Sequence, residues 1–527
     1  MTRRTWTLIA VVLGSGIVFL DSTIVNVALR AIAEQVPSTW VGSLEAQAYI
    51  NSGYLLTLAA LLILAGALAD TYGRRRLFVI GLIGFGVTSL ICGLSPNMEL
   101  LIAARLAQGA FGALLVPTSL ALINANFEGP ERGRAFGIWA AATSALVLLG
   151  PPVGGFLVDT FEWRIAFLVN VPLVAIGALI ALTRLTESRN EEAPQRFDWL
   201  GAAAVALAVG GLAYGAIRGE AQRWADPTAW AALAVGVIGT AALVPLMTRR
   251  PNPLVPPSLF ASRNFTITNI STLLIYGALY AYSSFQAIFL QGTLGYTAAG
   301  SGMAGVPVSI GLITLSTRFG RLAGERGPRL FMSVGPALMA LGLLWFLRLP
   351  ADSQPWQLSF ADPQTFVPPG GYLIDVLPAM VLFGLGISML VAPLTTALMT
   401  SVPTGNSGLA SAINNAISRI GPLLATAVIF IGVSATFYGA LADRLPGVDV
   451  SSDELRRELP PLNAPAQEAT DEERGAAAEA STDAFHLAML IAALLCAAGA
   501  AVNWAGIQDP SREALAAAER ESAPAGG

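Results

Sequence analysis

Three charged residues of this sequence stand inside long apolar stretches: Asp21, Arg105 and Arg419. A charge at the centre of a membrane-spanning helix costs about 2.5–3.5 kcal/mol on insertion scales, so such a residue indicates a functional site and requires a partner. A carboxylate whose distance from an arginine changes can bind and release a proton. We therefore predict that Asp21 exchanges protons and that Arg105 controls this exchange, with a permanent structural pair as the alternative.

Asp21 and Arg105 are expected at similar depths. If their stretches are helices, a rise of about 1.5 Å per residue places Asp21 roughly 13 Å from the end of its stretch near Arg30. The same rise places Arg105 roughly 9–10 Å from the start of its stretch near Glu99. The two side chains can therefore meet if they occupy facing sides of their helices.

Arg419 has no acidic residue at comparable depth in its part of the chain. Its partners are therefore expected among Asn414, Asn415, backbone carbonyl groups or a bound ligand, and a structural role and a ligand contact both stay open. The three charges sum to +1, which does not favour a doubly cationic ligand. The residues expected to line a cavity are Asn26, Tyr54, Gln108, Gln286, Asn414, Asn415 and Arg419.

The composition excludes several classes of protein. Of 527 residues, 54% are hydrophobic and only 12% are charged, against about 25% charged residues in average soluble domains. An ordinary soluble enzyme and a disordered chain are both excluded. One His and two Cys do not suggest a metal cluster, there is no basic patch for nucleic acid, and there is no Gly-x-x-x-x-Gly-Lys loop for ATP. We expect no metal and no cofactor, only a proton gradient as the energy source.

The apolar stretches predict an all-α polytopic membrane protein with fourteen spans of about 20 residues each. With the N-terminus in the cytoplasm, 19 of the 30 basic residues fall inside, nine outside and two within spans. Because cytoplasmic loops carry the excess of Arg, we expect a plasma (inner) membrane protein with both termini cytoplasmic. The spans run over 7–29, 47–69, 77–95, 99–122, 134–157, 165–183, 199–217, 228–247, 265–290, 300–318, 329–348, 373–397, 407–436 and 484–506.

One short sequence occurs twice. Gly66–Arg75 (GALADTYGRR) returns in degraded form as Gly320–Arg329 (GRLAGERGPR), an offset of 320 − 66 = 254 residues. Both copies follow an even-numbered span, which predicts two similar six-helix halves separated by two inserted helices. The expected units are residues 1–184, 185–263 and 264–506, then a cytoplasmic tail over 507–527. Within the second half, the acidic outer segment 437–483 is expected to be solvated, with a cap or docking surface as the alternative.

The first copy of this loop resembles the cytoplasmic loop signature of the major facilitator superfamily, Gly-x-Leu-Ala-Asp-x-x-Gly-Arg-Arg. The resemblance implies that Gly66, Asp70, Gly73, Arg74 and Arg75 form a gating latch between the halves. A loop that only anchors the topology is the alternative.

Two further motifs resemble transporter signatures of that superfamily. Arg105-Leu106-Ala107-Gln108-Gly109 is similar to the antiporter signature Arg-x-x-Gln-Gly, and Gly150-Pro151-Pro152-Val153-Gly154-Gly155 is similar to Gly-Pro-x-x-Gly-Gly, which marks exporters. The second motif implies a hinge formed by Gly150, Pro151, Gly154 and Gly155. A purely structural bend would have the same sequence.

A narrower resemblance is to the fourteen-helix drug:proton antiporter branch. It rests on Leu20–Leu29 (LDSTIVNVAL), Trp163–Pro172 (WRIAFLVNVP) and Gly408–Asn415 (GLASAINN) together with Arg419. The sequence departs from the family pattern in three places: Arg30 replaces a usual Pro, Tyr49 a frequent Trp, and Gly324 the Asp of the second loop copy. The last departure implies a weaker latch in the second half.

These observations together predict a secondary active transporter rather than an enzyme. The resemblance implies export of small organic compounds by proton antiport, with alternating access to a cavity between the halves. Its expected partners are the lipid bilayer, the substrate and protons, and the protein is expected to be a monomer. A lipid flippase, an importer and a non-transporting sensor on the same scaffold stay open as alternatives.

Overall fold

The chain is built of helices. The computed structural model describes residues 2–37, 43–189, 197–221, 226–250, 252–359, 362–446, 448–450, 452–466 and 469–509, and no strand occurs among them. Twelve helices of this described part are long and apolar enough to cross a membrane. Two further expected segments, 134–157 and 199–217, lie in helices α5 and α8, which are not among those twelve. The prediction of an all-helical, multi-pass membrane protein is confirmed.

The first half of the chain contains seven helices in one bundle. The expected span 165–183 is divided in two because Pro172 has no amide hydrogen with which to bond the carbonyl group of Leu168. The helices are α1 (Arg3–Gln35), α2 (Ser43–Tyr72), α3 (Arg74–Gly93), α4 (Met98–Asn126), α5 (Gly129–Thr160), α6 (Ile165–Leu168) and α7 (Asn170–Arg184).

The inserted pair, α8 (Trp199–Ala221) and α9 (Pro227–Arg249), packs together through Gly211, Gly215 and Gly236. Asp198 at its start accepts hydrogen bonds from the backbone amides of Gly201 and Leu254 and pairs with Arg250 at 2.6 Å.

The second half follows a similar plan. The expected span 300–318 is divided at Gly305, just before Pro307. The helices are α10 (Ser258–Ala261), α11 (Arg263–Gly292), α12 (Ala298–Ala304), α13 (Val306–Arg326), α14 (Arg329–Trp345), α15 (Leu377–Thr400), α16 (Ser407–Arg444), α17 (Asp453–Glu458) and α18 (Asp471–Gly506).

Segment 437–483 contains more helix than the sequence suggests. Helix α16 continues to Arg444, and α18 begins at Asp471 with a capping box formed by Thr470 and Glu473. Between them, Leu455, Leu459 and Leu462 are buried in the core of the second half. The expectation of a simply solvated segment is therefore wrong at these leucines, which pack as a cap on that half.

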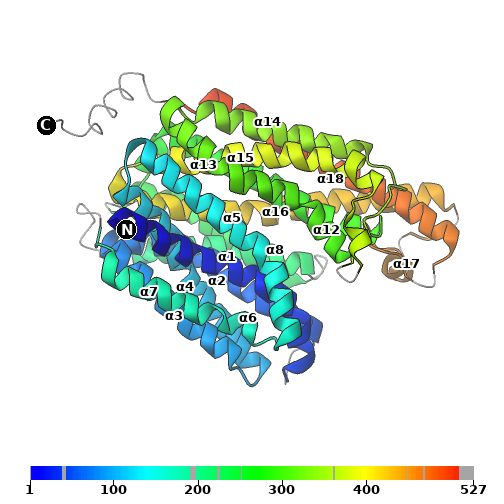
Figure 1. The fold of residues 1–527 in the computed structure, drawn as a ribbon, viewed down its shortest axis with the longest axis horizontal. Helices are drawn as coiled ribbons and strands as arrows, with labels where there is room; N and C mark the ends of the chain where they lie inside the picture. Colours follow the sequence, from blue (N-terminus) through cyan, green and yellow to red (C-terminus); the bar gives the residue numbers. More distant parts are fainter. Residues whose placement is uncertain are drawn as a thin grey trace.

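The two halves meet at one end of the molecule. One buried core contains residues of both halves, for example Ala67 and Leu122 with Leu398 and Leu409. The other two cores each belong to a single half. Figure 1 shows the start of α1 and the end of α18 at this shared end, and the halves diverging away from it. The structure is thus closed at the end that holds these two helix termini.

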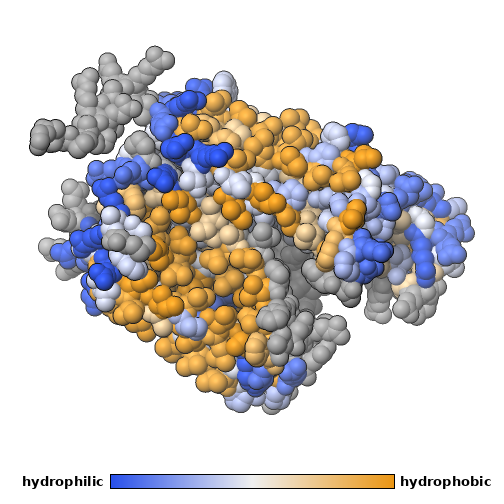
Figure 2. Space-filling model, viewed as in Figure 1, coloured by the Kyte–Doolittle hydropathy of each residue, from blue (hydrophilic) through white to orange (hydrophobic). Residues whose placement is uncertain are grey.

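Apolar side chains cover the middle of the surface. In Figure 2 they form a broad region over both halves, while hydrophilic side chains gather at the two ends of the view. Exposed members include Ile83, Val87, Ile176, Leu179 and Leu341. An exposed apolar surface of this extent requires a nonpolar surrounding, as in a lipid bilayer.

Candidate functional site

Arg105 and Gln108 form the centre of a buried polar network in the first half. They are three residues apart on α4, so their side chains project from the same face of the helix. Arg105 Nη1 donates to Gln108 Oε1 at 2.8 Å. Asn97 caps the start of α4 by accepting from the amide of Leu100, which fixes where the helix begins. The α4 face that bears both residues points at α1.

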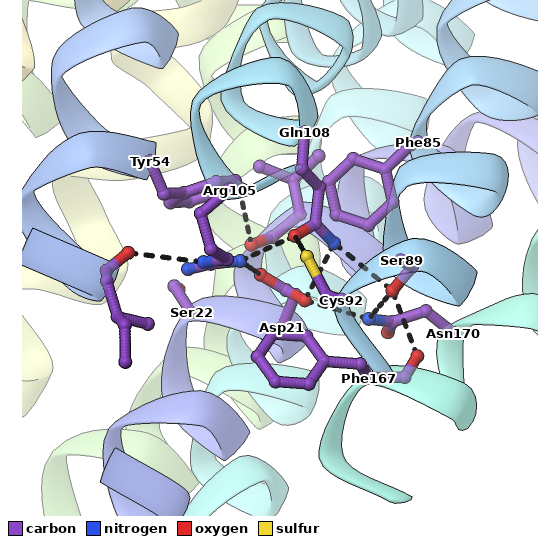
Figure 3. A network of polar contacts seen from close by, with 12 residues as sticks. Asp21, Ser22, Tyr54, Phe85, Ser89, Cys92, Arg105, Gln108, Phe167 and Asn170 are labelled. Carbon is purple, nitrogen blue, oxygen red and sulfur yellow. Dashed lines mark hydrogen bonds and ion pairs between the residues drawn. The ribbon is translucent and has the colours of Figure 1, made fainter. Parts of the chain in front are cut away.

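Asp21 on α1 accepts three hydrogen bonds within this network. Arg105 Nη1 donates to Asp21 Oδ2 at 2.6 Å, and Gln108 Nε2 donates to Oδ1 at 3.1 Å. The third bond comes from Asn170 Nδ2 on α7, at 2.8 Å. Figure 3 shows these side chains pointing at one another from three helices. The meeting of Asp21 and Arg105, expected from their depths alone, is present in the structure.

Ser89 on α3 closes the network on its far side. Its hydroxyl group accepts from Gln108 Nε2 at 3.2 Å and from Asn170 Nδ2 at 3.0 Å. It donates to the carbonyl oxygen of Phe167 at 2.9 Å. That carbonyl lies next to the break between α6 and α7, and Asn170 begins α7. The helix break that Pro172 causes therefore supplies two of the three partners of Ser89, the Phe167 carbonyl group and Asn170.

Tyr54 on α2 covers the arginine. The Arg105 guanidinium lies 4.1 Å from the centroid of the Tyr54 ring, a cation–π contact, and the Tyr54 hydroxyl donates to the carbonyl oxygen of Val18 at 3.3 Å. Arg105 Nε also donates to the Ile50 carbonyl oxygen at 3.3 Å. Tyr54, expected to line a cavity, instead lies fully buried against Arg105.

The network is sealed inside the first half. Asp21, Arg105, Gln108, Ser89 and Asn170 are all 0% exposed, and their partners all come from α1, α2, α3, α4, α6 and α7. Gln108, expected in the cavity between the halves, instead belongs to this network. Within it, Arg105 Nη2 and Asn170 Oδ1 have no hydrogen-bond partner among the described residues. The site therefore combines a neutral ion pair with two unused polar atoms.

The glycine motif of α5 packs directly on the helix that carries Asp21. An added methyl group on Gly150 would collide with Thr23, and one on Gly154 would lie 3.1 Å from the Ile24 Cα. These glycines therefore allow α5 to approach α1 within one turn of Asp21. Pro151 and Gly155 lie within α5, but their surroundings fall outside the described residues, as does the side chain of Asn26.

The repeated loop of the first half binds the second half. Asp70 accepts from the backbone amides of Gly408 at 3.1 Å and Leu409 at 2.8 Å, which are free donors at the start of α16. Arg74 donates to Asp70 Oδ1 at 3.0 and 2.9 Å, to the Gly405 carbonyl oxygen at 3.1 Å, and to the Thr404 carbonyl oxygen. Both side chains are buried, so this is a charged contact between the halves.

The remaining loop residues position that contact. Gly66 packs on the backbone of Gly408, and Gly73 has φ 111°, a turn that favours glycine. Arg75 holds α7 by donating to the carbonyl oxygens of Ala181 and Leu182. Gly66, Asp70 and Arg74 therefore lie at the contact between the halves, whereas Gly73 and Arg75 lie at a junction of the loop with α7 and the segment that follows it.

Glu187 belongs to the same junction, although the sequence did not single it out. Its carboxylate accepts from the backbone amides of Arg75 at 3.0 Å and Arg76 at 3.1 Å. It thereby caps the first turn of α3 from the segment that follows α7. An acid that follows a helix by a few residues is common in any sequence, so no pattern distinguished it.

The candidates in the second half do not form one cluster. Asn414 donates to Asn269 Oδ1 at 3.2 Å and to Thr272 Oγ1 at 2.8 Å, which joins α16 to α11. Gln286 is buried and contacts Met380 Sδ at 3.8 Å. Asn415 donates to the carbonyl oxygen of Ser411 on its own helix. These three side chains are engaged within their own half.

Arg419, which is partly buried, differs from them in its lack of a partner among the described residues. It makes no hydrogen bond or ion pair with the residues that the structure describes, and its buried Nε has no acceptor among them.

Fold and site together define a class: a polytopic helical membrane protein of two halves, with a buried charge pair in one half and a charged loop between the halves. A family model described as Major Facilitator Superfamily matches residues 11–426. The chain belongs to that superfamily, and it is a transporter rather than an enzyme.

Similar proteins of known name agree with this assignment. The chain is 35% identical over 424 residues to the multidrug resistance protein Stp of Mycobacterium tuberculosis, covering 80% of this chain and 74% of that protein. It is 33% identical over 428 residues to the tetracenomycin C resistance and export protein of Streptomyces glaucescens, covering 81% and 75%.

Solved structures share the fold. The human organic anion transporter MFSD10 superposes with a TM-score of 0.58 at 14% identity, covering 94% of this chain and 100% of that one. The proton:xylose symporter XylE superposes with a TM-score of 0.58 at 12% identity, covering 98% of each chain.

Proposed function

We propose that this protein is a proton-coupled exporter of small organic compounds, a fourteen-helix drug:proton antiporter of the plasma (inner) membrane with both termini cytoplasmic. The names of its relatives, which include resistance and export proteins for antibiotics, support export. The exporter-like glycine motif, with Gly150 and Gly154 packed on α1, supports the same direction. We propose further that it works as a monomer without a cofactor.

The observation that carries the proposal is the fully buried ion pair of Asp21 and Arg105, at 2.6 Å. A buried pair needs both charges, because removing one leaves the other uncompensated at a cost of about 3–5 kcal/mol. A proton on Asp21 would cancel its charge and leave Arg105 with only the neutral acceptors it already has, Gln108 and the Ile50 carbonyl group. Protonation would therefore favour a rearrangement of α1 against α4.

The closed end supports alternating access. With cytoplasmic termini, the end joined by Asp70, Arg74 and the start of α16 is the cytoplasmic one. The described structure then corresponds to the outward-facing state, in which Asp21 pairs with Arg105. Opening the cytoplasmic end would break the Asp70 contact, and a proton taken up outside would be released inside as the pair forms again.

The proton gradient supplies enough energy for this cycle. One charge moved through about 100 mV is worth roughly 2.3 kcal/mol, or some fiftyfold in concentration. One proton per cycle is therefore sufficient to concentrate a neutral compound outside the cell.

The test is Asp21→Asn in proteoliposomes, with tetracenomycin C, the compound in the name of one relative, among the compounds offered. We expect transport driven by an imposed pH gradient to fall to background, while exchange of compound for compound without a gradient continues. Asp198→Asn is the matched control, because Asp198 is also buried and paired with an arginine at 2.6 Å, but lies at the start of α8. It should keep gradient-driven transport.

Full gradient-driven transport by Asp21→Asn would refute the coupling role and leave a structural pair. Uptake in the direction of the proton flow would favour an importer. Translocation of lipid head groups without movement of the compounds would favour a flippase, and ligand binding without exchange would indicate a sensor.

A further inference from the structure

Arg419 lies on the face of α16 that looks toward the first half. Gly408, Ala412, Asn415 and Arg419 are separated by four, three and four residues, so they share one face of the helix. Gly66 of α2 packs against Gly408 and Ala412 on this face. The Arg419 side chain therefore lies on the face of α16 that contacts the first half, farther along the helix than the contact with Gly66.

The opposite face of α16 is already occupied. Gly421 approaches Leu273 of α11, where an added methyl group would lie 3.0 Å from the leucine carbonyl oxygen. Asn414, on this side of the helix, bonds to Asn269. These contacts fix the rotation of α16 and direct Arg419 away from its own half.

Tyr54 of α2 and Arg419 of α16 lie at similar depth. From the Gly66–Gly408 contact, Tyr54 lies twelve residues back along α2 and Arg419 eleven residues forward along α16. At a rise of about 1.5 Å per residue, both are roughly 16–18 Å from the closed contact, near the middle of a bilayer about 30 Å thick.

Arg419 is left as the unpaired charge at this depth. Asp21 is matched by Arg105 and Asp70 by Arg74. Arg419 forms no ion pair with any residue in the described ranges, and its buried Nε has no acceptor there. An arginine held at membrane depth without an anion is costly, so the arrangement favours a ligand that supplies one. Guanidinium groups recognise carboxylate and other planar anionic groups by paired hydrogen bonds.

We infer that Arg419, on the face of α16 turned toward the first half, is a subsite for the anionic group of the transported compound. The inference rests on the proposed export function and names its substrate class: amphipathic organic monoanions.

The export of a monoanion changes the net charge that crosses the membrane in each transport cycle. Export of a monoanion in exchange for one entering proton moves two positive charges inward per cycle, whereas export of a neutral compound moves one. The slope of the transport rate against membrane potential is therefore about twice as steep for the anion.

The first experiment measures binding without any gradient. The purified full-length protein in phosphatidylcholine nanodiscs is titrated with fluorescein, an anion, and with rhodamine 123, a cation on the same ring system, by fluorescence anisotropy. We expect the wild type to prefer fluorescein and Arg419→Gln to weaken that binding about tenfold or more, or about 1.4 kcal/mol per factor of ten. Arg419→Lys should retain most of the affinity, and rhodamine 123 should not lose affinity in Arg419→Gln.

Controls separate folding from recognition. Arg348→Gln removes an exposed arginine that stacks on Trp345 at the other end of the same half, and should leave fluorescein binding unchanged. Size-exclusion profile and thermal unfolding report whether Arg419→Gln is folded. Nanodiscs that contain phosphatidylglycerol distinguish the source of the anion: competition by this lipid that disappears in Arg419→Gln identifies a lipid head group as the ligand.

The outcomes are decisive in each case. Absence of fluorescein binding by the wild type, preference for rhodamine 123, or unchanged affinity in Arg419→Gln would each overturn the subsite. Asp21→Asn should still bind fluorescein, because it lies outside the subsite. Failure of proton-driven transport with intact Arg419-dependent binding would thus count against the proposed function alone.

Discussion

The loop Gly66–Arg75 and its copy Gly320–Arg329 begin the next helix in the same way. Each turns on a glycine in the left-handed region, with φ 111° at Gly73 and 92° at Gly327. In each half, a carboxylate from the segment that follows the last helix of that half caps the new helix, as Glu187 does for α3. In the second copy, the amide of Arg329 donates to Asp509 Oδ1 at 3.0 Å.

The two copies differ in how they hold the opposite half. The first offers Asp70 to the start of α16, where the amides of Gly408 and Leu409 are free. The second has Gly324 at the equivalent position, and Gly320 packs directly on the backbone of Gly133. The first contact is charged and the second is steric.

The difference follows from where the facing helices begin. Helix α16 begins at Ser407, so Gly408 lies in its first turn, where amides lack partners. Helix α5 begins at Gly129, so the amide of Gly133 is already within reach of the Gly129 carbonyl group. An acid at position 324 would find no free donors there. The closed end therefore has one side that a change of charge can open and one side that depends on the close packing of two helices.

The largest effect is expected from Asp70→Asn. This change leaves Arg74 buried without its counter-charge and removes a carboxylate acceptor from two amides, at a cost of about 3–5 kcal/mol to the closed state. The measurement is the labelling rate of a thiol introduced by Thr317→Cys, which lies where α13 touches Gly137. Labelling should accelerate at least about tenfold; an unchanged rate would show that the loop only anchors the topology.

The double variant Asp70→Asn with Gly324→Asp sharpens the comparison. If the two copies were interchangeable, an acid in the second would restore closure. We expect no recovery of slow labelling, because the facing helix has no free amides at this point. Recovery would show that charge alone, in either copy, is enough.

A smaller effect is expected on the steric side. In Gly320→Ala, the new methyl group would lie 2.8 Å from the Gly133 carbonyl oxygen, so α13 and α5 must separate. Overpacking of this kind costs about 1–3 kcal/mol, and thiol labelling should accelerate less than in Asp70→Asn. Gly439→Ala is the control, since the space around that glycine is open. Equal labelling in the two alanine variants would contradict the steric role.

Much of this architecture was predictable because membrane spans depend on runs of apolar residues. The helices, the repeated loop and the meeting of Asp21 with Arg105 follow from hydropathy, self-similarity and depth along a helix. The latch residues Asp70 and Arg74 were predictable only as a motif. The partners of Asp70 in the second half, the amides at the start of α16, and those of Arg74, the carbonyl oxygens of Thr404 and Gly405, lie 330 residues or more away in the sequence.

Other parts depend on helix rotation and on loops, which apolar runs do not encode. Gln108 was expected in the cavity, yet it faces Asp21, because depth does not fix which side of α4 it occupies. Ser89 and Asn170 are small polar residues of a kind common in membrane helices. The cap formed by Leu455 and its neighbours was hidden by eleven acidic residues in the same segment.

The smallest effects are expected from the two helix caps, Glu187→Gln and Asp509→Asn. Glu187 accepts from the amides of Arg75 and Arg76, whereas Asp509 accepts from one amide at the start of α14. A capping side chain typically contributes about 1 kcal/mol, so Glu187→Gln should lower thermal stability slightly and Asp509→Asn about half as much. Neither variant should change thiol labelling at Thr317→Cys, because each cap joins helices of one half. A labelling change in Glu187→Gln would mean that the cap transmits closure through α3, and the two loop copies would then differ in more than Asp70.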